Sequence, residues 1–164
     1  MTASESDGVA FRTVMRRFAT GVTVVTTTVD GVPKGFTANS FASVSAEPPT
    51  ILICVNRQAR SHPLIARASH FCVNILGLDQ RDVAERFASR STAEPFAGID
   101  YRSERTGSPV FADSLAFLDC KLAEEHSAGT HTIFLGEVVA CGSREGSPLG
   151  YFNAAYRDFQ CTTL

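Results

Sequence analysis

The sequence predicts a mainly β protein, an antiparallel barrel of the Greek-key type with peripheral helices, and three observations carry that prediction. Runs of β-branched and apolar residues outnumber helical patterns. Short turn signals such as Asp30-Gly31 join these runs, where a parallel sheet would need helical crossovers. No GxGxxG motif follows a predicted strand, so a Rossmann dinucleotide site is not expected. An antiparallel barrel is therefore favoured over a doubly wound parallel sheet.

The elements can be assigned in order along the chain. Apolar residues at helical spacing predict a first helix that ends at Thr20-Gly21, and short helices over 63–68 and 79–88. Polar residues with Gly, Pro and Ser predict a surface loop over 89–109, and the segment 149–159 is rich in aromatic residues. Apolar and β-branched runs predict the strands, which are 22–29, 34–38, 51–55, 71–76, 115–125 and 132–141.

Composition limits the classes of protein that the chain can belong to. Its 164 residues, 44% of them apolar, are expected to form one globular domain over 1–164. A net charge of −2 gives no basic surface for nucleic acid. No apolar run approaches the ~20 residues that span a membrane, and 1–8 does not resemble a signal peptide. The five scattered cysteines are interpreted as reduced thiols in a cytoplasmic protein, with no metal site.

The segment 35–56 is the most informative part of the sequence. Small hydroxyl and amide side chains crowd its first half, which ends at Pro48-Pro49, and an apolar strand follows directly. Such a run offers many hydrogen-bond donors but few side chains for a core, which suits a polar, planar or phosphate-bearing ligand. The alternative interpretation is a solvated loop between two strands.

With these elements placed, the chain resembles the short-chain flavin reductases, which are the reductase components of two-component flavin-dependent monooxygenases. The matching segments occur in the family's order and span nearly the whole chain: 11–26, 35–49, 71–76, 84–87, 129–138 and 148–152. The resemblance implies a split β-barrel that binds FMN or FAD, oxidises NADH or NADPH and forms a homodimer. It also implies a separate monooxygenase that receives the reduced flavin.

The resemblance also assigns the flavin site. A wall around the isoalloxazine ring, a second flank on the next strand, and phosphate and ribityl contacts are expected from three groups of residues. The wall is formed by Lys34, Gly35, Phe36, Thr37, Asn39 and Ser40, and the second flank by Cys54, Val55 and Asn56. The phosphate and ribityl contacts are Arg60, Ser61, Arg86 and Phe87, and Tyr156 falls in the nicotinamide region. Without the resemblance, Arg60 and Arg86 would be solvated charges, and Cys54, Val55 and Phe87 would be core residues.

His131 is the residue that the family places beside the nicotinamide. Hydride transfer to a flavin needs two rings at roughly 3 to 3.5 Å but no protein nucleophile. His131 would therefore orient the carboxamide or interact with charge on the reduced flavin, unless it is only a strand histidine satisfied by a carbonyl. His126, five residues earlier, gives poor evidence for a metal site.

The chain departs from the family pattern at three places. Thr130 replaces a frequent aspartate before the histidine, so any charge partner for His131 must come from elsewhere. Ala154-Ala155 replaces a stretch that is usually glycine-containing, and His62-Pro63 follows Ser61 where smaller hydroxyl residues are common; these two departures bear on cofactor preference. The alternatives from other classes are a non-catalytic flavin-binding barrel, a reductase acting on a target such as a corrinoid, and an oxidase of the pyridoxamine-phosphate type.

Overall fold

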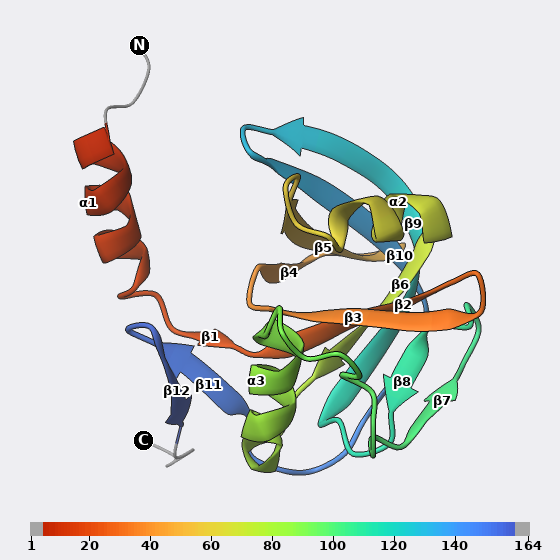
Figure 1. Cartoon of the computed structure of the whole chain (residues 1–164). Coiled ribbons are helices and arrows are strands. Elements are labelled where there is room, and N and C mark those ends of the chain that lie inside the picture. The colour runs from red at the N-terminus through yellow and green to blue at the C-terminus, as the bar shows by residue number, and fades with distance from the viewer. Residues whose placement is uncertain (1–4, 160–164) are drawn as a thin grey trace.

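The computed structural model describes residues 5–159, and every strand pairing within them is antiparallel. The largest sheet contains β2 (Thr23–Val29), β3 (Val32–Ala38), β4 (Phe41–Ala46), β5 (Pro49–Asn56), β6 (His70–Ile75), β9 (Ala116–Ala128) and β10 (His131–Ser143). Its strand order is β3-β2-β6-β9-β10-β5-β4, and the sheet curls into a barrel (Figure 1). The mainly β, antiparallel prediction is confirmed.

Two smaller sheets and the helices surround this barrel. One small sheet holds β1 (Thr20–Gly21), β11 (Leu149–Phe152) and β12 (Ala155–Asp158), and the other holds β7 (Tyr101–Ser103) and β8 (Pro109–Phe111). The helices are α1 (Glu5–Met15), α2 (His62–Ala68), the 3-10 turn η1 (Leu78–Gln80) and α3 (Arg81–Ala88). No helix within residues 5–159 combines the length and apolarity needed to cross a membrane.

The barrel is split between β3 and β4, which are the two edge strands of the large sheet. Only Asn39 and Ser40 separate them in sequence, and Ser40 is tied to β5 because the Cys54 N–H donates to its carbonyl at 3.1 Å. The sequence analysis missed β4 and treated its residues as part of a turn or loop. Apart from Phe41, the side chains of β4 are exposed, so no apolar alternation marks it as a strand.

Alternation along β5 separates the barrel core from the outer face. Ile51, Ile53 and Val55 are buried and join Phe71 and Phe134 in the core. The intervening residues of β5 therefore point to the other face of the sheet. A second cluster, built around Phe87, Phe111 and Leu149, fills the space between α3 and the sheets. Burial of these apolar side chains is the main term that holds the barrel together.

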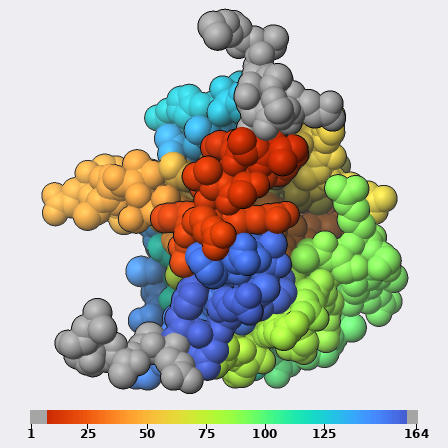
Figure 2. All heavy atoms as spheres, turned by 90° about the vertical axis from the view of Figure 1, so that its left-hand side faces the viewer, coloured from red at the N-terminus to blue at the C-terminus, as the bar shows by residue number. Residues whose placement is uncertain are grey.

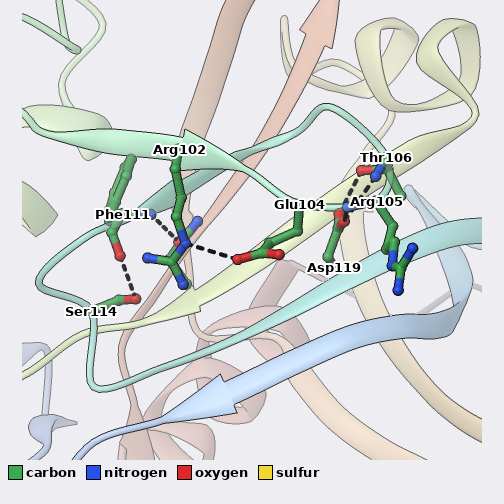
Figure 3. Close-up of polar contacts among 8 residues, drawn as sticks. Arg102, Glu104, Arg105, Thr106, Phe111, Ser114 and Asp119 are labelled. Carbon is green, nitrogen blue, oxygen red and sulfur yellow. Dashed lines mark hydrogen bonds and ion pairs between the residues drawn. The ribbon is translucent and has the colours of Figure 1, made fainter.

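A buried carboxylate anchors the 104–108 loop to the barrel (Figure 3). Asp119 on β9 is fully buried, and one of its oxygens accepts hydrogen bonds from the backbone N–H groups of Arg105 and Thr106 at 2.8 and 2.9 Å. The Thr106 hydroxyl donates to the other oxygen. Ser108 then links Thr106 to Nδ1 of His70, which lies 2.8 Å from the Ser108 hydroxyl. The end of the predicted surface loop, 104–108, is therefore held firmly against the barrel.

The first helix stands apart from the barrel (Figure 1). Phe11, Val14 and Phe18 are 65%, 67% and 66% exposed, so this chain alone does not cover its apolar residues. The segment after the helix is held where the Asn153 N–H donates to the Arg16 carbonyl at 3.0 Å. A first helix is confirmed, but its predicted end is wrong: α1 ends at Met15, Thr20–Gly21 forms β1, and the apolar side chains of the helix face away from the core.

Candidate active site

The split in the barrel opens beside a cavity of about 570 Å³ that lies between α1, β5 and the β11–β12 turn. Three of the residues expected at the flavin line it: Asn39, Ser40 and Cys54. In Figure 2, α1 crosses this face directly above the blue C-terminal strands, and the orange β4–β5 hairpin projects to one side. The structure therefore brings the Asn39–Ser40 turn and the outer face of β5 to one cavity.

Asn39 and Ser40 play different parts in this hollow. The Ser40 hydroxyl is already used, because it donates to the Cys54 carbonyl at 2.8 Å. Asn39 is exposed, and its amide has no hydrogen bond within residues 5–159. Burial raises the pKa of the Cys54 thiol, so this side chain stays uncharged. Of the three, Asn39 is the side chain that remains available to a ligand.

Thr37 and Tyr156 meet at a second, smaller cavity of about 200 Å³, which Asn39 also lines. The Thr37 hydroxyl donates to the Ala84 carbonyl at 2.6 Å and so joins β3 to α3. Burial, and less strongly the nearby Glu85, raises the pKa of Tyr156. The structure thus places Tyr156 next to the predicted flavin wall, although 115 residues lie between Ser40 and Tyr156 in the sequence.

The first part of the predicted wall is held by packing. Phe87 is buried and lies against Gly35, while Phe36 packs onto the barrel core. Lys34 is exposed. The close approach that glycine allows at Gly35 is that of the Phe87 ring, so Phe87 is the core residue that the sequence alternative described. Val55 likewise points into the core, which leaves only its backbone for a ligand.

The predicted phosphate and ribityl contacts differ in whether their side chains already have hydrogen-bond partners. Arg60 is exposed, and neither its guanidinium nor the Ser61 hydroxyl has a side-chain partner in the part of the chain that the structure describes. Arg86, by contrast, donates from Nη1 to the Ala97 carbonyl at 2.7 Å. The side chains of Arg60 and Ser61 are therefore more available than that of Arg86 to bind a phosphate.

His131 begins β10 and pairs in register with Asn56 at the end of β5. Two residues further on, Ile133 pairs with Cys54, so His131 lies on the same face of the sheet as Cys54. Its Nδ1 is 2.9 Å from the Thr130 hydroxyl. The hydrogen-bond partner of the His131 ring is thus the adjacent threonine. His126 pairs instead with Glu124 at 2.9 Å on the exposed hairpin.

Sequence reasoning missed several residues around the larger cavity. Met15 and Arg16 at the end of α1 line it, as do Asn153 and Ala154 in the β11–β12 turn. Asn153 and Ala154 have φ values of 51° and 61°, the left-handed pair that a tight hairpin turn requires. The asparagine was a usable signal because it tolerates this conformation, whereas Ala154 gives none. Among residues 5–159, no cluster of three or more His, Cys, Asp or Glu side chains could hold a metal ion.

Comparison with known proteins identifies the family. The sequence profile of the flavin reductase like domain matches residues 15–160. The chain is 42% identical over 157 residues to the reductase subunit HsaB of a flavin-dependent monooxygenase from Rhodococcus jostii, a match that covers 95% of this chain and 80% of HsaB. The chain therefore belongs to the flavin reductase family.

Two solved structures show the same fold. Nitrilotriacetate monooxygenase component B from Mycobacterium thermoresistibile superimposes with a TM-score of 0.92 at 38% identity, covering 99% of this chain and 93% of that one. The NADH:FAD oxidoreductase SgcE6 of Streptomyces globisporus, in complex with NAD and FAD fragments, gives 0.90 at 36% identity and covers 98% of both chains. The split-barrel expectation is confirmed, and the chain is an NAD(P)H-dependent flavin reductase.

Proposed function

We propose that this protein reduces a flavin held along the Asn39–Ser40 turn and passes it to a separate monooxygenase. The observation that carries the proposal is that the split of the barrel brings Asn39, Ser40 and Cys54 to one cavity. The accessible surface of the cavity walls is mostly apolar, with polar side chains such as Asn39 among them, as is usual for small-molecule sites. The reductase role itself follows from family membership.

The residues present fit a flavin. The Asn39 amide, the Ser61 hydroxyl and the Arg60 guanidinium are polar groups without side-chain partners among residues 5–159. When bound, a flavin supplies an acceptor for the hydride of NADH. Asn39 would bind the ring edge, and Arg60 with Ser61 would bind the phosphate through charge-assisted hydrogen bonds. His131, on the Cys54 face, would orient the nicotinamide.

The activity is tested by measuring NADH and NADPH oxidation with FMN, FAD and riboflavin in turn. Purified, flavin-free protein should oxidise the nicotinamide nucleotide only when flavin is added. Turnover without flavin, or none with any of the three, would contradict the proposal. The same assay shows which flavin and which nucleotide the protein prefers.

The phosphate contact is tested by Arg60→Ala. Loss of a charge-assisted hydrogen bond should weaken FMN binding ~10- to 100-fold, while riboflavin, which has no phosphate, should bind as before. Arg90→Ala, which removes another exposed arginine, is the matched control and should change neither affinity. Equal losses for FMN and riboflavin in fluorescence titrations would move the phosphate elsewhere.

We further propose that the protein is a homodimer with its flavin near the interface. The exposed Phe11 and Val14 of α1, and Phe18 just after it, support this, because such apolar surface is normally covered by a partner. The closing aromatic residues Tyr151, Phe152 and Phe159 are half-buried and so offer less apolar surface to a partner, and the Tyr151 ring packs on Tyr156. Sedimentation should show a dimer, and Val14→Glu should weaken it. A fully active monomer would refute this.

A cytoplasmic location is also proposed. The four cysteines that the structure describes are all free thiols, and Cys72 and Cys120 are completely buried. Free thiols persist in reducing compartments, which supports the cytoplasm. Cell fractionation with an antibody to the protein tests this, and recovery in a secreted or membrane fraction would contradict it.

A further inference from the structure

The side chain of His62 is held at two points by strand β10. Its Nε2 is 2.8 Å from the hydroxyl of Thr132, which is only 5% exposed. Its ring lies 5.3 Å from the ring of Phe134 at an interplanar angle of 54°. A hydrogen bond together with an aromatic contact fixes both the position and the tilt of the imidazole.

The strand that holds His62 is the one that carries His131. Thr132 follows His131 directly, and successive side chains of a strand point to opposite faces. One face of this short segment therefore presents His131 beside Asn56 and Cys54. The other face presents Thr132 and Phe134, which hold His62.

His62 is also the residue next to Ser61, and so to the proposed phosphate contact. The turn that carries Arg60 and Ser61 is fixed at its start, where the Ala59 N–H donates to the Asn56 carbonyl at 2.9 Å. At its end, Ser61 has no side-chain capping bond to α2. His62 is thus the side chain that ties this end of the turn to the sheet.

We propose that His62 is a positioning residue that sets the Arg60–Ser61 phosphate contact in place relative to β10 and His131. This rests on the proposed flavin site and adds a residue to it. The hydrogen bond spans 70 residues of sequence. It connects the turn proposed to bind the flavin phosphate with the strand that carries the proposed nicotinamide contact, His131. Without this hydrogen bond, Arg60 and Ser61 would sample more positions. Binding of a phosphate-bearing flavin would then be weakened by the conformational entropy lost when these side chains become ordered.

The test compares FMN with riboflavin in variants that remove this one bond. His62→Leu keeps apolar contact with Phe134 but cannot bond Thr132, and Thr132→Val removes the hydroxyl while keeping the shape. Each should weaken FMN binding about 3- to 10-fold, the range for one neutral hydrogen bond, and leave riboflavin within about twofold. His62→Gln, whose amide can replace Nε2, should restore FMN binding. The double variant His62→Leu/Thr132→Val should be no weaker than either single one.

Ser127→Ala is the matched control, because Ser127 pairs with Thr132 in register and its exposed hydroxyl has no partner among residues 5–159. Equal losses for FMN and riboflavin, or no loss for FMN, would overturn the proposal. Arg60→Ala shows whether a negative result contradicts only the role of His62 or the phosphate contact as well. If it discriminates FMN from riboflavin and His62→Leu does not, only the role of His62 fails. If it does not discriminate, the phosphate contact fails with it, while flavin-dependent NADH oxidation still stands or falls on its own assay.

Discussion

Gly35 on β3 lies directly against the ring of Phe87 on α3. A β-carbon added at Gly35 would come within 2.9 Å of Phe87 Cε1 and 3.2 Å of the Val25 carbonyl oxygen. The first of these distances is too short for a real contact, and the backbone carbonyl cannot move away easily. Any larger side chain at this position would therefore push α3 away from the wall that Thr37 joins to it.

Gly35→Ala should destabilise the protein and weaken flavin binding together. Overpacking of a filled site commonly costs about 1 to 3 kcal/mol, and urea unfolding and fluorescence titration measure the two effects. Gly21→Ala is the control, because nothing lies within 4 Å of a β-carbon at Gly21. Phe87→Leu in the Gly35→Ala background should recover part of the loss. If Gly35→Ala binds flavin normally, the Phe87 contact does not shape the site.

His131→Ala should slow flavin reduction and raise the Michaelis constant for NADH, with little change in flavin affinity. An orienting contact commonly contributes ~10- to 100-fold in rate, because near-attack geometry is lost while every reacting group remains. Stopped-flow reduction of bound flavin measures the rate. His126→Ala, which removes an exposed histidine paired with Glu124, should behave like the parent. Parental rates in the His131 variant would make it a structural strand residue.

Stability should fall as the pH drops below the ordinary histidine value, and His70 should contribute to this. Burial lowers the pKa of His70, and the Asp119 carboxylate raises it by a smaller amount. The folded protein therefore binds this proton less readily than the unfolded chain does. The contribution is fully present above about pH 6.5 and is lost as the pH falls from there through the lowered folded value.

Urea midpoints between about pH 7.5 and 5 measure this effect on either side of the ordinary histidine pKa. His70→Asn retains a hydrogen-bonding group toward Ser108 but does not titrate, so its profile should be flatter over the same range. Parallel profiles for the two proteins would show that His70 plays no part.

The thiols should react in an order set by their burial. Cys141 is exposed and should react first with a thiol reagent, whereas Cys72 and Cys120 should not react in the folded protein. Burial raises the pKa of Cys120 to about 12, which suppresses its thiolate. Cys54 lines the larger cavity, so FMN should slow its modification. Mass spectrometry of a Cys161→Ser background, with and without FMN, identifies each site. Unchanged Cys54 labelling would place the flavin outside this cavity.

The sequence by itself determined the class of fold and six of the seven strands of the large sheet. β-branched runs such as 22–29 and the Asp30-Gly31 signal depend on local preferences, and β2, β3 and their hairpin follow from them. The ordered motifs also identified the family. β4 escaped detection because it is an exposed edge strand without alternation, so its pairing with β5 supplies a signal that its own residues lack.

Only the tertiary structure decided which of these residues meet and which are already occupied. Pairing of β10 with β5 sets His131 opposite Asn56, and pairing of β11 with β12 helps to bring Tyr156 to the same small cavity as Thr37 and Asn39. The fold also commits the Ser40 hydroxyl to Cys54 while leaving Asn39 open. Contacts of this kind depend on strand register and on the closure of long loops. These are settled by burial over the whole barrel, so no local stretch of sequence could specify them.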